Sequence, residues 1–290
     1  MTGAPVHAAA RPGRPVVIEA AVLDERQYQR ICELVRRRAR IELGNAKRQL
    51  CQTRLLRRLK ALGIPTFKQY LALLDDPHAE EHDELINAIT TNVTAFFRED
   101  HHFEFLAQHV LPERMAANPD HRLRVWSAGC SSGEEPWSIA MVVREAVPEG
   151  WNTRILATDI DTHVLARAEA GVYKEEQVEP VSLARRKRFL HRGSGANAGK
   201  VRVGAELRPL VTFKELNLFE PWPMKGPFDV VFCRNVIIYF DVENKVRLLR
   251  HFHDVLAPGG TLVLGHSESL VAGVTGFTPC GRTAYRRDRG

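Results

Sequence analysis

The chain has 290 residues, which is enough for one large domain or two ordinary ones. Hydrophobic residues make up 44% of it and charged residues 26%, a composition that excludes a wholly disordered, collagen-like or fibrous protein. No apolar run approaches the roughly 20 residues of a membrane-spanning helix, and the first twenty residues lack the apolar segment of a secretory signal. Five scattered cysteines without a CxxC pair indicate reduced thiols in a cytoplasm.

The formal net charge of +6 is concentrated in one segment. Residues 25–62 hold twelve Lys or Arg against three acidic residues, so the rest of the chain is slightly acidic. A basic segment of this kind usually meets an acidic partner, which can be a nucleic acid, a membrane surface or an acidic protein. A well-solvated helix face is the alternative.

The first part of the chain is predicted to be helical. Residues 1–20 have little to bury and are predicted to form a flexible tail. Four short amphipathic helices are expected to follow: Asp24 and Gln27 form a capping box for the first, Gly63 ends the second, and Thr66 caps the third. Since no strand pattern separates them, we predict a small all-helical domain over 21–91 and a linker over 92–110.

From about residue 122 strand-like and helical patterns alternate, which specifies a mostly parallel sheet covered on both faces. A second, α/β domain is therefore predicted over 111–290. Its helices are expected over 135–145, 162–170 and 243–255. The expected strands are LRVWSAG, RILATDI, LVTFKELN, FDVVFCRNVIIYF and TLVLGHS. The Gly-rich stretch 173–210 interrupts this pattern and predicts an inserted small β element.

The first of these strands ends in Ser127-Ala-Gly-Cys-Ser-Ser-Gly-Glu-Glu-Pro136. Small residues such as Gly129 let the backbone approach a ligand at a helix N-terminus. Glu134 and Glu135 would repel a pyrophosphate there but attract an ammonium or a sulfonium. The motif therefore favours S-adenosylmethionine over a dinucleotide, with an ordinary Gly-rich turn as the alternative.

The second strand ends in Asp159. An acidic residue at this place in a doubly wound sheet accepts hydrogen bonds from ribose hydroxyls. Helix capping is the structural alternative, and Asp161 can supply the cap while Asp159 binds.

Five long motifs in the same order resemble those of the chemotaxis receptor glutamate methyltransferases, the CheR family. They are TTNVTAFFRE (90–99), SAGCSSGEEPWS (127–138), ATDID (157–161), FCRNVIIYF (232–240) and LGHSE (264–268). The resemblance covers nearly everything after Leu23. It implies an α/β fold: a small all-helical domain, then a Rossmann-like class I methyltransferase domain with an inserted small β-subdomain.

The resemblance also implies a function, which is methyl transfer from S-adenosylmethionine to glutamate side chains of chemoreceptors, with S-adenosylhomocysteine as the other product. Asp159 would take the ribose, and Asn217 and Leu218 would lie beside the adenine. The cofactor contacts that it implies are Asn92, Thr94, Arg98, Glu134, Asp159, Asn217, Leu218, Arg234 and Asn235.

Two regions are expected to meet the receptor. The basic helices would hold its acidic helical bundle through Arg54, Arg57 and Arg58. The loop Arg192–Gly199, with Gly193 and Gly195, resembles the β-subdomain loop that docks on a receptor's C-terminal pentapeptide, although it lacks the proline often found after the second glycine. We expect a monomer with no nucleic-acid partner, no membrane insertion and no metal.

A glutamate carboxylate is already ionised at neutral pH, so methylating it needs no general base. The protein has to orient the carboxylate and exclude water, and Arg98 and Tyr239 are the candidates for orienting it. Arg98 as a structural ion pair and Tyr239 as a core aromatic are the alternatives.

Two rival functions stay open at this point. A nucleic-acid methyltransferase would use the basic helices on phosphates, but its usual Asn/Asp-Pro-Pro-aromatic string is replaced here by Arg234-Asn-Val-Ile237. A non-catalytic, cofactor-sensing scaffold is the other rival. Transfer of a labelled methyl group would distinguish it from an enzyme.

Overall fold

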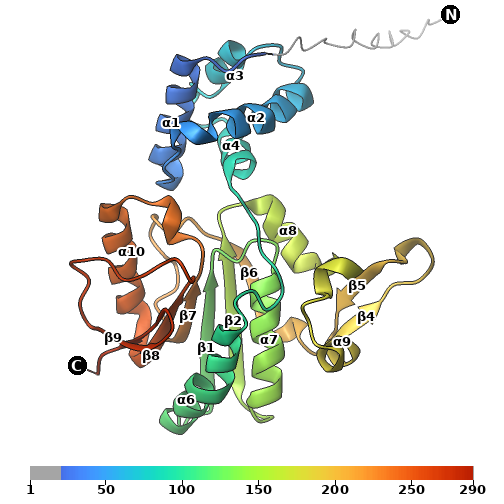
Figure 1. The fold of residues 1–290 in the computed structure, drawn as a ribbon, viewed down its shortest axis with the longest axis vertical. Coiled ribbons are helices and arrows are strands. Elements are labelled where there is room, and N and C mark those ends of the chain that lie inside the picture. The colour runs from blue at the N-terminus through green and yellow to red at the C-terminus, as the bar shows by residue number, and fades with distance from the viewer. Residues whose placement is uncertain (1–20, 290) are drawn as a thin grey trace, which may run out of the picture.

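The computed structural model describes residues 21–289, so the predicted tail lies outside the described residues. A helical domain stands above a larger α/β domain, and a small sheet projects from the side of the latter (Figure 1). The arrangement confirms the predicted fold class. No helix within residues 21–289 is both long and apolar enough to cross a membrane.

The helical domain forms as its local signals predict. Its helices are α1 (Glu25–Ala39), α2 (Arg48–Leu62), α3 (Phe67–Leu73) and α4 (Glu81–Ile89), with a short 3₁₀ turn at Asn45–Lys47. Asp24 and Gln27 make the reciprocal capping box, Gly63 ends α2 in the left-handed region, and Thr66 accepts from the N–H of Gln69. Tyr28, Ile31, Leu55 and Leu59 are among the side chains of its own core.

The segment predicted as a linker is more structured than expected. It is helical from α5 (His101–Phe105) through a π-helical turn (Leu106–Val110) into α6 (Leu111–Ala117). Phe96, Phe97, Phe103 and other apolar side chains of the segment are buried in the core of the second domain. We call residues 92–100, which precede α5, the connector.

Seven strands within the described residues form the main sheet, in the order β6-β2-β1-β7-β8-β10-β9. The first five are parallel, and β10 pairs antiparallel with both β8 and β9. The strands are β1 (Arg122–Ala128), β2 (Asn152–Asp159), β6 (Val211–Glu215), β7 (Phe228–Cys233), β8 (Leu256–Leu264), β9 (Phe277–Gly281) and β10 (Ala284–Arg287).

Two details differ from the sequence prediction. The β9–β10 hairpin at the edge of the sheet was not predicted. The strand predicted over 228–240 ends at Cys233, because Asn235 takes a left-handed conformation and a 3₁₀ turn follows at Ile237–Tyr239.

Helices cover the two faces of this sheet. Successive residues of β1 point to opposite faces, so Val125 packs with α7 (Glu134–Ala146) while Trp126 packs with α10 (Val242–Val255). Helix α8 (Thr162–Ala170) follows β2. The inserted element is confirmed as a separate antiparallel sheet, β3-β5-β4, made of β3 (Val172–Lys174), β4 (Leu190–Arg192) and β5 (Lys200–Val203), with α9 (Leu183–Phe189) beside it.

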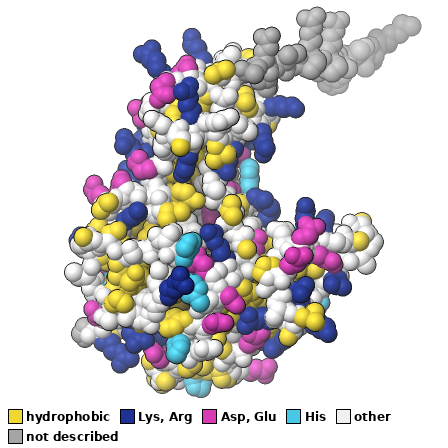
Figure 2. Space-filling view, viewed as in Figure 1, with side chains coloured by type: hydrophobic (Ala, Val, Ile, Leu, Met, Phe, Trp, Pro, Cys, Tyr) yellow, Lys and Arg dark blue, Asp and Glu magenta, His cyan; other side chains and the backbone are white. Residues whose placement is uncertain are grey.

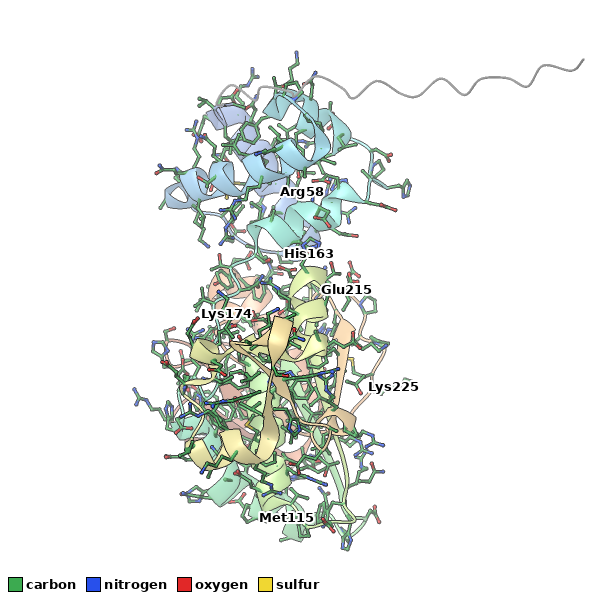
Figure 3. The ribbon with its side chains drawn as sticks, turned by 90° about the vertical axis from the view of Figure 1, so that its right-hand side faces the viewer. Arg58, Met115, His163, Lys174, Glu215 and Lys225 are labelled. Atoms are coloured by element: carbon green, nitrogen blue, oxygen red, sulfur yellow. The ribbon has the colours of Figure 1, made fainter. Side chains whose placement is uncertain are left out.

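The helical domain sits on the carboxyl ends of the parallel strands (Figure 1). At the junction, visible near His163 in Figure 3, Nε2 of His163 lies 3.0 Å from a Glu84 carboxylate oxygen. Beside it, Nδ2 of Asn87 donates to Oγ1 of Thr162 at 3.0 Å. The carboxyl ends of parallel strands are where ligands bind in open α/β sheets, so a ligand there would lie between the two domains.

Candidate cofactor and substrate site

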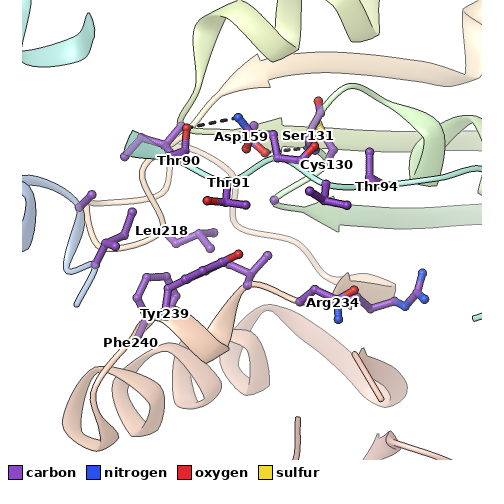
Figure 4. A pocket seen from close by; sticks show the side chains of 18 of the residues that line it. Thr90, Thr91, Thr94, Cys130, Ser131, Asp159, Leu218, Arg234, Tyr239 and Phe240 are labelled. Atoms are coloured by element: carbon purple, nitrogen blue, oxygen red, sulfur yellow. Dashed lines mark hydrogen bonds between the residues drawn. The ribbon is translucent and has the colours of Figure 1, made fainter. Parts of the chain in front are cut away.

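A cavity of about 1050 Å³, its open mouth included, lies between the helical domain and the carboxyl ends of β1, β2 and β7. Figure 4 shows Asp159 and Ser131 across the cavity from Tyr239 and Phe240. The predicted site residues that line the cavity are Asn92, Thr94, Arg98, Gly129, Asp159, Asn217, Leu218, Arg234, Asn235 and Tyr239.

The turn after β1 brings backbone close to the cavity. Gly129 has a φ of 81°, and a Cβ there would lie 2.4 Å from a methyl carbon of Val236. The N–H groups of Gly129 and Cys130 both donate to the carbonyl of Thr158, at 2.8 and 2.9 Å. This position therefore needs glycine, which fixes where the turn approaches a ligand.

Asp159 is buried at the end of β2 and keeps acceptor capacity on its carboxylate. Its oxygens accept from the N–H of Ser131 at 2.7 Å and from the N–H of Asp161 at 3.0 Å. Burial raises its pKa to about 6, although these two N–H groups oppose the shift. A carboxylate so placed can still accept bonds from two vicinal hydroxyls, as a ribose requires.

Asp161 caps α8, accepting from the N–H groups of His163 and Val164. Its other oxygen accepts from Oγ1 of Thr90 at 2.9 Å and from Nδ2 of Asn92 at 2.6 Å. The Asn92 amide, predicted to touch the cofactor, thus also ties the connector to α8.

Glu134 is the predicted cofactor residue that the structure does not bring to the cavity wall. Its carboxylate accepts from Oγ of Ser132 at 2.7 Å and lies 3.5 Å from Nε2 of Gln177, toward the small sheet. Glu135 lines the cavity instead, and it is paired with Nη1 of Arg234 at 3.0 Å. Adjacent residues of a helix project about 100° apart, and here Glu135 faces the cavity while Glu134 points toward the small sheet.

The loop after β7 is held by Glu268, a residue that the sequence analysis did not select. The buried Glu268 carboxylate accepts from the N–H groups of Gly265 at 2.7 Å, Asn235 at 2.8 Å and Ile238 at 3.3 Å. These bonds fix the loop that carries Arg234, Asn235 and Tyr239. Glu268 is the last residue of the LGHSE motif, but the sequence alone does not show that its carboxylate binds the loop at Asn235 and Ile238.

Arg98 and Tyr239 both line the cavity, and both are partly exposed. Nη1 of Arg98 donates to the carbonyl of Val93 at 2.8 Å, and Arg98 forms no ion pair with any residue in 21–289. Lys47, from the helical domain, also lines the cavity, with Nζ 4.9 Å from the centroid of the Tyr239 ring. Lys47 could not be selected from the sequence, because Tyr239, its neighbour in space, is about 190 residues away in the chain.

The wall beside Leu218 is apolar and comes from both domains. Leu218 is 8% exposed, and Ile41, Leu43, Ile160 and Leu216 also line the cavity. Next to it, Nδ2 of Asn217 donates to the carbonyl of Arg38 at 2.7 Å. Asn217 therefore joins the domains, and the apolar surface beyond it suits a flat aromatic base.

These residues fit S-adenosylmethionine. Asp159 offers acceptors for the ribose, and the apolar wall offers a surface for adenine. When bound, the sulfonium supplies an electrophilic methyl group.

The predicted receptor contacts on α2 are in two different situations. Arg58 pairs with Glu81 at 2.6 Å and Glu84 at 2.9 Å, and Nη1 of Arg54 donates to the carbonyls of Ile89 and Thr90 at the end of α4. Both side chains are thus committed to the helical domain itself, because α2 packs against α4. Arg57 is exposed and makes no ion pair within the described chain.

In the predicted loop on the small sheet, Gly193 is crowded and Gly195 has a backbone conformation that favours glycine. A Cβ on Gly193 would lie 2.2 Å from the carbonyl oxygen of Asn197, and Gly195 has a φ of 57°. A second groove lies beside this loop, between η3 (Glu175–Val178) and α9.

Comparison with known proteins gives consistent results along the chain. A family model for the CheR methyltransferase all-alpha domain matches residues 26–90, and one for the CheR methyltransferase SAM-binding domain matches residues 92–286. The chemotaxis protein methyltransferase of Klebsiella aerogenes is 45% identical over 91% of this chain and 90% of its own length. Those of Salmonella typhimurium and Escherichia coli are 42% identical, over 91% and 92% of this chain and 90% and 92% of theirs. The chain therefore belongs to the CheR methyltransferase family, and S-adenosylmethionine is the cofactor of its second domain.

Proposed function

We propose that this methyltransferase of chemotaxis esterifies glutamate side chains on the cytoplasmic helices of chemoreceptors. The observation that carries the proposal is the charge at the cavity. Arg234 is neutralised by Glu99 and Glu135, whereas Arg98 and Lys47 have no acidic partner among the described residues. An open cavity with two free cations suits an anionic acceptor.

The chemistry asks little of the protein beyond placement. The carboxylate oxygen attacks the methyl carbon while the carbon–sulfur bond breaks and its electron pair stays on sulfur. No proton moves, because the acceptor is already ionised. Arg98 and Tyr239 hold the carboxylate in line with the methyl group, and the walls of the cavity replace part of its hydration. Arg98 must do so through few hydrogen bonds, since a tight bidentate pair would lower the nucleophilicity of the carboxylate.

The receptor would approach over the helical domain. Lys and Arg side chains project from the face of this domain seen in Figure 2. Arg36, Arg37 and Arg57 are exposed, and they would attract an acidic helical bundle before a glutamate enters the cavity. This gives the basic segment a protein partner in place of nucleic acid.

A receptor C-terminal peptide would dock on the small sheet. β5 is its central strand, so β3 and β4 each have an edge on which an extended peptide can add a strand. The groove beside it is lined by acidic residues, among them Glu176 and Glu179, and by basic residues, among them Arg186 and Lys187, while Glu175 and Arg192 pair with each other at 3.5 Å. Such a lining would bind a peptide that carries both charges and an apolar side chain.

The test is transfer of labelled methyl from S-adenosylmethionine to receptor cytoplasmic fragments, with and without their last residues. We expect label on the fragment that mild alkali releases as methanol, as from a methyl ester. Alkali-stable label, label on nucleic acid or no transfer would each contradict the proposal. The last outcome would favour the scaffold.

A further inference from the structure

The carboxylate of Glu99, in the connector directly after Arg98, joins three segments that are distant in the sequence. Its Oε2 accepts from the backbone N–H of His266 at 3.0 Å and lies 3.1 Å from Nη2 of Arg234. Its Oε1 lies 2.7 Å from Nδ1 of His266. Burial alone would raise the pKa of Glu99, but the His266 hydrogen bond and the Arg234 charge lower it to about 2. The carboxylate is therefore ionised at neutral pH.

The backbone around Arg98 is unusual. Phe97 has a φ of 53° and Glu99 a φ of 58°, so Arg98 lies between two residues in the left-handed region. Residues other than glycine adopt this region at a cost, and it persists only where surrounding contacts hold it. Phe97 is held by the bond from its N–H to Oγ of Ser138 at 3.0 Å and by packing on Phe103. Glu99 is held by its own carboxylate.

The same carboxylate also fixes Arg234. Nη1 of Arg234 donates to Glu135, while Nη2 contacts both Glu99 and the carbonyl oxygen of Arg98. The Arg234 side chain is 2% exposed and lines the cavity. Without the Glu99 charge Arg234 would keep one anionic partner. The connector would then be held to the loop after β7 only through the Arg98 carbonyl, and its bond to His266 in the loop after β8 would be weakened.

We propose that Glu99 is a positioning residue for methyl transfer: by joining Arg234 and His266 it holds the connector over the cofactor cavity and directs Arg98 into it. Glu99 does not line the cavity itself, so it acts through its neighbours. Its effect is on the cofactor as well as on the acceptor, because Asn92, Thr94 and Arg98 of the connector all line the cavity.

The substitution Glu99→Gln keeps the side-chain size and removes the charge. We expect the Kd for S-adenosylhomocysteine, measured by calorimetry, to rise about 10- to 100-fold, since small misplacements of binding groups have effects of this size. The melting temperature should stay within about 5 °C of the wild type. Glu104→Gln is the matched control, because Glu104 is exposed, follows Glu99 by five residues and makes no ion pair within residues 21–289.

A second variant keeps the proposal falsifiable if Glu99→Gln unfolds. His266→Ala removes a ring whose side chain is 55% exposed and leaves the backbone bond in place. On its own His266→Ala should raise the Kd for S-adenosylhomocysteine above that of the wild type, and an unchanged Kd would overturn the proposal even if Glu99→Gln unfolds. Where Glu99→Gln folds, the rise should be smaller than for Glu99→Gln, with no further rise when the two are combined. The proposal is overturned if Glu99→Gln binds like Glu104→Gln, if the two effects multiply independently, or if affinity falls only together with the melting temperature. Because the readout is cofactor binding, it does not depend on which acceptor is methylated.

Discussion

The backbone N–H of Glu42 donates to the carbonyl oxygen of Tyr239 at 2.9 Å, which joins the helical domain to the loop after β7. Five residues further along the chain, Lys47 places its ammonium 4.9 Å from the Tyr239 ring centroid. Tyr239 is thus held from the first domain through both its backbone and its ring. The cavity is complete only when both domains are in place.

Replacing Tyr239 by Phe tests its role in orienting the acceptor. The ring, the Lys47 contact and the Glu42 bond remain, so only the hydroxyl is lost. A hydrogen bond to a charged group contributes about 1.5–3 kcal/mol, so we expect kcat for methyl transfer to fall about 10- to 100-fold. Cofactor affinity should stay unchanged. Tyr285→Phe, on β10, is the matched control, and equal rates for both variants would make Tyr239 only a core aromatic.

Replacing Asp159 by Asn tests the ribose contact and its pH dependence. We expect calorimetry at neutral pH to show a Kd at least about tenfold higher, because a charged acceptor is lost. In the wild type the pKa of about 6 makes affinity increase as pH rises from 5 to 7, since the ionised form is the better acceptor. Asp159→Asn should remove this dependence.

The stability of the cofactor-free protein should move the other way with pH. A pKa raised above the ordinary 3.8 means that the folded state holds this proton more tightly than the unfolded chain. The Asp159 contribution to the free energy of unfolding therefore decreases as pH rises from about 4 to 6. Glu149→Gln is the control, because Glu149 is exposed and makes no ion pair within residues 21–289. If the affinity for S-adenosylhomocysteine changed neither with pH nor on the substitution Asp159→Asn, the ribose role of Asp159 would be rejected.

Arg58 is expected to matter for stability. Its partner Glu81 has a side chain only 6% exposed and also accepts from the hydroxyl of Tyr70 at 2.9 Å. Arg58→Ala would leave a buried carboxylate without a cation, which costs several kcal/mol in full burial. Because the Arg58 side chain is 24% exposed, we expect Arg58→Ala to lower the free energy of unfolding by about 2–3 kcal/mol, as measured by chemical denaturation. Arg57→Ala should change the free energy of unfolding by less than about 0.5 kcal/mol, and equal effects would contradict this assignment.

Arg57 is the residue of α2 at which receptor binding can be tested without disturbing the fold. Arg57→Glu should raise KM for a receptor fragment about 3- to 10-fold at low salt and less at high salt, with cofactor Kd unchanged. Lys225→Glu is the control, on an exposed position of the second domain far from Arg58 (Figure 3). If receptor KM and cofactor Kd changed together, or neither changed, the basic surface would have another role.

Local signals carried much of the prediction. Asp24, Gly63 and Thr66 act through neighbours within a few residues, so the helical domain could be outlined from sequence. Asp159 could be selected because the end of a buried strand fixes the place of its side chain. The choice between Glu134 and Glu135 could not be made in the same way, since it depends on which helix face meets the cavity.

The remaining features depend on long-range contacts. The net charge of α2 is the same whether Arg54 and Arg58 bind a receptor or bind α4. The sequence therefore could not show that both side chains contact α4. Glu99 contacts Arg234 more than 130 residues further along the chain, and Glu268 binds Asn235, 33 residues before it. Only the folded arrangement shows that both hold the Arg234 loop.

A crystal structure with S-adenosylhomocysteine tests the central claim most directly. We expect the ribose hydroxyls on the Asp159 carboxylate, the adenine against Leu218, and the sulfur directed toward the space between Arg98 and Tyr239. A nucleoside bound elsewhere on the protein, or a sulfur directed away from those two side chains, would contradict the account.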